Sequence, residues 1–137
     1  MCAARPDWGL ALRIGMEQPN RFQKLVAEAK KYIKEISPND AALELSCGAA
    51  TLIDVRSDED WKAGHAPGAK HLNRGEVEVE IEEQVPDLDQ RIICYCGGGS
   101  RSALVAESLQ KMGYRNVRSM TGGFRGWKTA GLPTAVD

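Results

Sequence analysis

The residues with the clearest chemical potential lie in one short segment, Cys96-Gly97-Gly98-Gly99-Ser100-Arg101-Ser102. Its glycines let successive backbone amides point into a common concavity, and a helix beginning near Arg101 would add unpaired N–H groups and the positive end of its dipole. Such a site favours an anion, so the pKa of the Cys96 thiol is expected to lie below the usual value of about 8.5. Arg101 adds a full positive charge. The segment therefore predicts that Cys96 is a nucleophile at neutral pH without an adjacent general base.

The remaining cysteines carry weaker signals. Cys94 lies two residues earlier in the same apolar run, and residues two apart in a strand share a face. Two roles stay open for it: a buried core residue, which we favour, or a thiol that forms a disulfide with Cys96. Cys2 and Cys47 have no pattern that assigns them a function. The four cysteines form neither a disulfide framework nor a zinc-type Cys-x2-Cys pair, so no metal is expected, and free thiols favour a cytoplasmic location.

A strand and a helix are expected to position Cys96. The apolar run 91–96 predicts a strand ending at the cysteine, and residues 101–112 have the spacing of an amphipathic helix that stops at Gly113. Further strands are predicted at 51–55, 69–73 and 116–120, and further helices at 38–46, 57–63 and 124–130. This alternation predicts a three-layer α/β fold, with a central parallel sheet of about five strands flanked by helices on both faces. In such sheets ligands bind beyond the carboxyl ends of strands, where Cys96 lies.

The other parts of the chain are less regular. Residues 1–19 have no clear period and predict a mobile tail. Apolar residues near helical spacing predict an amphipathic surface helix over 21–34, although residues 32–36 also fit a first short strand. Residues 75–90 are rich in glutamate and predict a solvated helix or loop.

The composition fits a single globular domain and excludes several classes of function. The chain has 137 residues, of which 42% are hydrophobic and 27% charged. Its formal net charge of -1 gives no electrostatic basis for a nucleic-acid or membrane-surface partner. No apolar run approaches the roughly 18 residues that a membrane span requires, and no secretory signal is expected at the amino terminus.

The loop and its flanking motifs resemble those of the rhodanese family. The active loop of that family reads Cys-x-x-Gly-x-Arg, which matches the segment from Cys96 to Arg101 with Gly99 at the inner glycine. Two further signatures of the family are matched by Leu52-Ile53-Asp54-Val55-Arg56 with Gly64-His65-Ala66-Pro67-Gly68-Ala69, and by Gly122-Gly123-Phe124 with Trp127 and Gly131-Leu132-Pro133. The resemblance covers residues 32–134 and implies the rhodanese fold. It divides the chain into an N-terminal extension with an amphipathic helix (1–31) and a rhodanese-like domain (32–137).

The resemblance also implies an activity. Cys96 would attack the sulfane sulfur of a donor such as thiosulfate, become a persulfide, and pass the sulfur to cyanide or a thiol in a two-stage transfer. The implied enzyme is a thiosulfate:cyanide-type sulfurtransferase that needs no cofactor. Its substrate-binding loop would consist of Gly97, Gly98, Gly99, Ser100, Arg101 and Ser102. The implied partners are a small sulfur compound and a cyanide or thiol acceptor, with a thioredoxin-like or other sulfur-acceptor protein as a further candidate.

Two other functions stay open. A non-enzymatic sulfur carrier or regulatory module that docks a partner would form the same persulfide with negligible turnover. A Cys-based phosphatase or arsenate reductase is less favoured, because the related phosphatases of this fold have one more residue between the cysteine and the arginine. The acidic Glu59-Asp60 pair and the lack of a loop lysine also favour a donor other than thiosulfate, such as a persulfide.

Several residues near the motifs invite a functional interpretation. Asp54 and Arg56 are predicted to form a supporting ion pair behind the loop rather than to act as catalysts. For Arg101, contact with the substrate or another anion is favoured over a structural ion pair with an acidic side chain. His65 is predicted to make structural hydrogen bonds, because the expected mechanism needs no general base.

Overall fold

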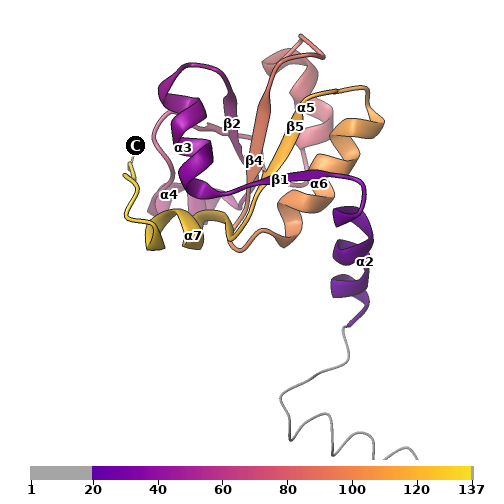
Figure 1. Cartoon of the computed structure of the whole chain (residues 1–137), viewed down its shortest axis with the longest axis horizontal. Helices are drawn as coiled ribbons and strands as arrows, with labels where there is room; N and C mark the ends of the chain where they lie inside the picture. Colours follow the sequence, from indigo (N-terminus) through magenta and orange to yellow (C-terminus); the bar gives the residue numbers. More distant parts are fainter. Residues whose placement is uncertain (1–19, 137) are drawn as a thin grey trace, which may run out of the picture.

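The computed structural model describes residues 20–136, so the predictions for residues 1–19 and for Cys2 lie outside the described residues. Within this range one parallel sheet has the strand order β1-β5-β4-β2-β3 (Figure 1). Its strands are β1 (Lys34–Ile36), β2 (Thr51–Asp54), β3 (Lys70–His71), β4 (Ile92–Tyr95) and β5 (Val117–Met120). The predicted parallel sheet is confirmed, and β4, which leads into Cys96, is its central strand.

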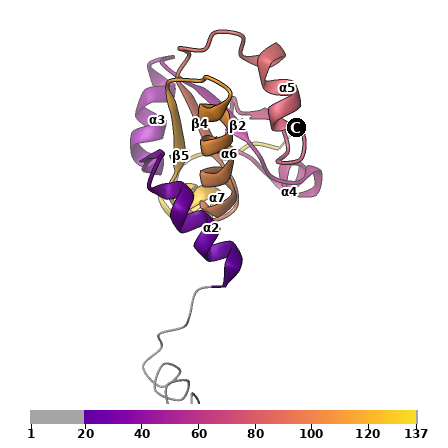
Figure 2. The same cartoon turned by 90° about the vertical axis from the view of Figure 1, so that its right-hand side faces the viewer.

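Helices cover both faces of the sheet, which gives the three predicted layers (Figures 1 and 2). On one face lie α2 (Arg21–Lys30), α5 (Val77–Gln84) and α6 (Ser100–Lys111); on the other lie α3 (Pro38–Ser46) and α7 (Gly123–Thr129). The short helix α4 (Asp58–Ala63) follows β2 at the same end of the molecule as α7. The end of β4 therefore faces the beginnings of two helices, α6 and α7.

Strand β4 is buried on both sides, as its continuous apolar run indicates. Because successive strand residues point to opposite faces, Ile92, Cys94 and Cys96 enter the core beneath α5 and α6. Ile93 and Tyr95 enter the core beneath α3 and α7. The catalytic candidate thus shares its face of the sheet with Cys94.

Serine caps fix the starts of two of the predicted helices. The Ser37 side chain accepts a hydrogen bond of 3.1 Å from the backbone N–H of Asp40, at the start of α3. Ser57 accepts one of 3.2 Å from the N–H of Asp60, at the start of α4. The two caps fix the residues at which the helices after β1 and β2 begin.

The predicted helix over 21–34 is too long. Helix α2 ends at Lys30, and residues 34–36 form β1, which was the alternative for this segment. Strand β1 pairs with β5 at the edge of the sheet and buries Ile36. This tertiary pairing overrides a helical period that continues in the sequence.

The acidic segment 75–90 contains a helix, as one of its two alternatives predicted, but the helix is only half solvated. Residues 77–84 form α5, and Val77, Ile81 and Val85 lie fully or almost fully buried in the core. They are spaced four residues apart, so they share one helix face. Val79 is 81% exposed on the outer side. In the sequence, apolar residues and glutamates alternate from Val77 to Glu82, so the four-residue spacing of the buried residues is not apparent.

Helix α2 packs against α6 through a narrow apolar face. Val26 and Ala29 are buried, whereas Phe22 and Leu25 stay exposed. The division of the chain after residue 31 stays a prediction, but α2 is in direct contact with the helix that follows Cys96. Across residues 20–136, every helix is too short or too polar to cross a membrane.

Candidate active site

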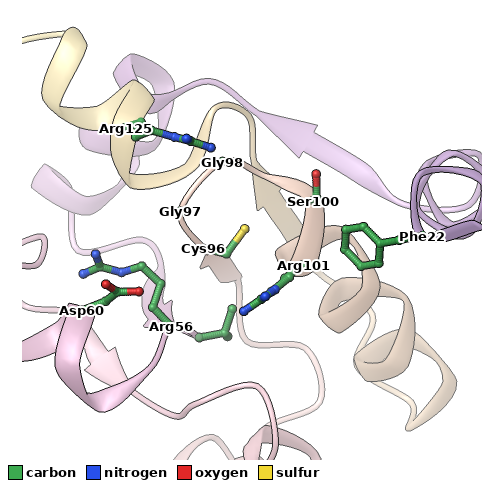
Figure 3. A pocket seen from close by; sticks show the side chains of 10 residues that line it. Phe22, Arg56, Asp60, Cys96, Gly97, Gly98, Ser100, Arg101 and Arg125 are labelled. Carbon is green, nitrogen blue, oxygen red and sulfur yellow. The ribbon is translucent and has the colours of Figure 1, made fainter. Parts of the chain in front are cut away.

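Cys96 lies at the base of a pocket at the carboxyl end of β4 (Figure 3). The residue is 3% exposed, and the pocket above it has a volume of about 250 Å³. Most of the predicted loop meets there, together with residues from α2, α4 and α7. The lining consists of Phe22, Val55, Arg56, Asp60, Cys96, Gly97, Gly98, Ser100, Arg101 and Arg125.

Backbone and hydroxyl groups of the loop surround the sulfur of Cys96. The N–H groups of Gly99 and Ser102 donate to Sγ at 3.1 and 3.4 Å, and the Ser102 hydroxyl lies 3.6 Å from it. Burial raises the pKa of the Cys96 thiol, but the Ser102 hydroxyl and the N–H groups of Ser102, Gly99 and Gly98 together outweigh it. The resulting pKa lies below the ordinary value, so the site favours the thiolate.

Arg101 is not among the groups with the largest effect on the pKa of Cys96. Apart from burial, those groups belong to Ser102 and to the glycine backbone. The Arg101 side chain is exposed on the pocket wall and forms no ion pair with any residue in the described range 20–136. Its position is that of a group available to a bound anion.

Glycines at two positions allow the loop and α7 to pack closely. Gly99 has a φ of 98°, and a Cβ there would lie 3.1 Å from the backbone nitrogen of Gly122. Gly123 has a φ of 57°, and a Cβ there would overlap the carbonyl oxygen of Cys96. With no side chain in the way, the N–H of Phe124 donates to that oxygen at 2.7 Å. The start of α7 thereby holds the Cys96 loop in place.

The predicted ion pair between Asp54 and Arg56 is present, and both of its side chains are largely buried. Arg56 Nη2 lies 2.9 Å from Asp54 Oδ2 and also donates to the carbonyl oxygen of Gly64 at 2.6 Å. The Tyr95 phenol accepts the N–H of Ala66 at 3.1 Å, and burial together with the nearby Asp54 carboxylate raises the pKa of this phenol. The network ties the 64–66 segment to the residue just before Cys96. Removing one partner would leave a buried charge uncompensated.

This arrangement of loop and supporting signature matches a known family. Rhodanese-like domains match the chain over residues 37–130. The chain belongs to the rhodanese-like domain family.

Three related proteins show how far the similarity extends. The thiosulfate sulfurtransferase GlpE of Haemophilus influenzae is 41% identical over 100 residues, which cover 73% of this chain and 92% of GlpE. A Rhodopseudomonas palustris protein of unknown function, described as a possible tyrosine phosphatase, superimposes with a TM-score of 0.75 at 31% identity, over 88% of this chain and 99% of that one. The polysulfide-sulfur transferase homodimer of Wolinella succinogenes gives a TM-score of 0.73 at 29% identity, over 85% and 88% of the two chains.

Two other residues considered in the sequence analysis of this rhodanese-like domain, His65 and Cys94, are buried in the structure. The His65 ring is buried, stacks on Trp61 with 3.5 Å between ring centroids, and places Nδ1 3.0 Å from the Trp61 carbonyl oxygen. The Cys94 side chain is fully buried, and burial raises the pKa of its thiol to about 12. Between residues 20 and 136, His, Cys, Asp and Glu side chains form no group of three that would hold a metal.

Three residues at the site have no counterpart in the sequence prediction. Phe22 comes from α2, outside the family match, and Arg125 comes from α7 (Figure 3). Ser119 lies on β5, and its hydroxyl is 2.8 Å from that of Ser102, which orients the group beside Cys96. The sequence feature that could have pointed to Phe22 is its size, because it is the largest apolar side chain of α2. Arg125 lies within the third signature but not at one of its matched positions, and Ser119 lies in no motif.

Proposed function

We propose that this rhodanese-type sulfurtransferase carries sulfur on Cys96 as a persulfide, taken from a sulfane donor such as thiosulfate and passed to cyanide or a thiol. The observation that carries the proposal is the set of hydrogen-bond donors directed at Cys96 Sγ from Gly99 and Ser102. These donors stabilise an anionic sulfur in a pocket open to solvent. The 41% identity to a protein named thiosulfate sulfurtransferase supports the same chemistry.

In the first half-reaction the Cys96 thiolate attacks the outer sulfur of thiosulfate. A bond forms between Sγ and that sulfur, while the sulfur–sulfur bond of the donor breaks and sulfite leaves with its electron pair. The negative charge on the protein then lies on the outer persulfide sulfur. The N–H groups of the loop and the start of α6 favour an anion at this position. No proton has to move, so the step needs no general base.

In the second half-reaction a nucleophile removes the outer sulfur. Cyanide or an acceptor thiolate attacks it, the persulfide bond breaks, and the electron pair returns to Cys96 as a thiolate. The product is thiocyanate or an acceptor persulfide. A thiol acceptor, small or on a thioredoxin-like protein, suits the cytoplasmic location that we propose from the free thiols of Cys47, Cys94 and Cys96.

A phosphatase is the second candidate, because one structural relative is described as a possible tyrosine phosphatase. We rank it lower on the length of the loop. Only Gly97 to Ser100 separate Cys96 from Arg101, and the cradle is shorter than the one that phosphatases of this fold use for phosphate. A phosphatase also needs a hydrogen-bond cradle for three oxygens, whereas Gly99 and Ser102 direct their N–H groups at Sγ itself.

The intact mass of the protein before and after incubation with thiosulfate tests the proposal. The wild-type mass should rise by one sulfur atom and return to its starting value when cyanide is added, with release of thiocyanate. The Cys96→Ser variant should show no gain, whereas the matched Cys94→Ala variant should behave like the wild type. A wild-type protein that gains no sulfur from thiosulfate, polysulfide or a small persulfide contradicts the proposal.

Steady-state assays separate the competing functions. Turnover of thiosulfate and cyanide supports the enzyme. A stable persulfide without turnover supports the sulfur-carrier alternative instead. Hydrolysis of a generic phosphate ester or reduction of arsenate, lost in Cys96→Ser, would support the phosphatase or reductase alternative.

A further inference from the structure

The pocket above Cys96 has more positive than negative charge on its wall. Arg56, Arg101 and Arg125 line it, against a single carboxylate from Asp60. Arg56 is neutralised by its buried ion pair with Asp54. Arg101 and Arg125 are exposed, and neither forms an ion pair with another residue of the described chain. Two guanidinium groups are therefore available to a ligand.

The backbone of Arg125 is fixed to the active loop. Helix α7 begins at Gly123, and the N–H of Arg125 donates to the carbonyl oxygen of Gly97 at 3.1 Å. The neighbouring N–H of Phe124 bonds to the carbonyl oxygen of Cys96. These bonds attach the first turn of α7 to the loop, so the side chain of Arg125 starts from a defined position beside the pocket.

The guanidinium of Arg125 then extends over Gly98 (Figure 3). A Cβ atom at Gly98 would overlap Nη2 of Arg125, so the arginine occupies the space that the missing side chain leaves. In this view Arg101 lies on the other side of Cys96, at the start of α6. The sulfur is thus flanked by one guanidinium from each of two helices.

We propose that Arg125 is a specificity-determining residue that, together with Arg101, binds the anionic end of the sulfur donor. This inference rests on the proposed function. In thiosulfate the sulfane sulfur is attached to a sulfonate group, and the group that leaves is an oxyanion. A guanidinium matches oxyanions with paired N–H donors, and two such groups favour a dianion over a monoanion. The sulfane sulfur would then face Cys96, with the oxygens directed toward the pocket mouth.

The proposal explains how this site handles an anionic donor without a lysine in its loop. The extra positive charge comes from α7, in a position that the Cys-to-Arg motif does not contain. It also weakens the sequence argument that the Glu59-Asp60 pair disfavours thiosulfate. Of these two acidic residues only Asp60 lines the pocket, and the positive charges of Arg101 and Arg125 exceed its single negative charge.

Steady-state kinetics of Arg125→Gln test the proposal with two donors: thiosulfate, a dianion, and methanethiosulfonate, a monoanion. We expect the KM for thiosulfate to rise about tenfold, as for the loss of one charge-assisted hydrogen-bonding group, with kcat nearly unchanged. The KM for methanethiosulfonate should rise by a smaller factor. Arg125→Lys should recover part of the loss, because it keeps the charge but not the paired donors.

Lys128→Gln is the matched control on the same helix. Lys128 is exposed and does not line the pocket, and its Nζ lies 5.2 Å from the centroid of the Phe124 ring. Its removal lowers the net charge by the same amount and should leave KM within about twofold of the wild type, as for an isolated surface charge. Equal rises of KM in both variants would overturn the proposal, and so would an unchanged KM in Arg125→Gln.

The two donors also separate this inference from the proposed function. If wild-type Cys96 gains sulfur and Arg125→Gln has the wild-type KM for both donors, the role of Arg125 is refuted while the sulfurtransferase stands. If wild-type Cys96 gains no sulfur from any donor, both fail. A KM for Arg125→Lys as high as that of Arg125→Gln would refute a charge-based role.

Discussion

The interior and the end of β4 hold two cysteines in contrasting chemical states. Cys94 and Cys96 are separated by one residue, point to the same face of the sheet, and are 0% and 3% exposed. Yet burial raises the pKa of Cys94 to about 12, whereas the pKa of Cys96 lies below its ordinary value. Burial alone therefore does not determine whether a thiol in this protein is reactive.

The difference comes from the backbone groups available to each sulfur. Cys94 pairs in register with Ile53 of β2 and Ser119 of β5, so nearby amides are committed to the sheet. Cys96 lies just past the end of β4, where the chain turns and the N–H groups of Gly99 and Ser102 point back at its sulfur. A strand end supplies hydrogen-bond donors that the strand interior has already used.

Substituting each cysteine separately is the strongest test of the contrast between Cys94 and Cys96. Cys96→Ser should abolish thiocyanate formation from thiosulfate and cyanide, because a serine hydroxyl is not ionised at neutral pH. Cys94→Ala should keep the activity, because the transferred sulfur is not bound to Cys94. Thiocyanate assays on both variants check this, and a Cys94→Ala variant as inactive as Cys96→Ser would mean that the buried thiol takes part in the reaction.

Alkylation as a function of pH should separate the two thiols directly. Since the pKa of Cys96 is lowered, its thiolate fraction rises at a lower pH than that of a free cysteine peptide, and the rate of reaction with iodoacetamide rises with it. Cys94, with a pKa of about 12, stays protonated and inaccessible between about pH 5 and pH 9. Fragment mass spectrometry assigns the modified cysteine. A midpoint for Cys96 at or above that of the free peptide contradicts the stabilised thiolate.

Removal of the Ser102 hydroxyl should reduce the difference between the pKa values of Cys94 and Cys96. Ser102→Ala deletes the group that most lowers the pKa of Cys96, so this pKa should rise toward the ordinary value. We expect the activity at pH 7 to fall roughly tenfold, as for the loss of one hydrogen bond to a charged group, and to recover in part at higher pH. The pH profile of kcat/KM checks this; a uniform loss at every pH would indicate a structural defect.

The smallest expected effect is on stability at the strand interior. Cys94→Ala removes one buried heavy atom from the core beneath α6 and should lower the free energy of unfolding by roughly 1 kcal/mol, as for Ile→Val changes. Urea denaturation measures it. Because the site itself is unchanged, kcat/KM should stay at the wild-type value, which separates packing from catalysis.

Much of the fold follows from local patterns. Helices α3 and α4 and the apolar runs of β2 and β4 were predictable, because each depends on neighbouring residues alone. The predictions fail where the alternatives are close in local energy. Residues 34–36 join the sheet only because β5 offers an edge, and the stripe Val77, Ile81, Val85 faces the core only because the sheet lies beneath it.

The same division holds for the active site. Cys96, its glycines and the Asp54–Arg56 pair are adjacent in sequence or belong to family signatures, so the sequence predicts them together. The donors around Sγ were expected from the loop, but the dominance of Ser102 over Arg101 was not. Which of two nearby groups reaches a sulfur depends on side-chain direction, and the direction of the Ser102 hydroxyl is fixed by its hydrogen bond to Ser119 of β5.

By itself, the sequence determines that Cys96 follows a buried strand and begins a glycine-rich loop that leads into a helix, because strand, glycines and helix are encoded within a few residues of one another. Only the tertiary structure decides that Phe22 and Arg125 line the same pocket. They lie far from Cys96 along the chain, and contacts across such separations arise when α2 packs on α6 and α7 bonds to the loop. Local chemistry thus identifies the nucleophile, while long-range packing selects what can approach it.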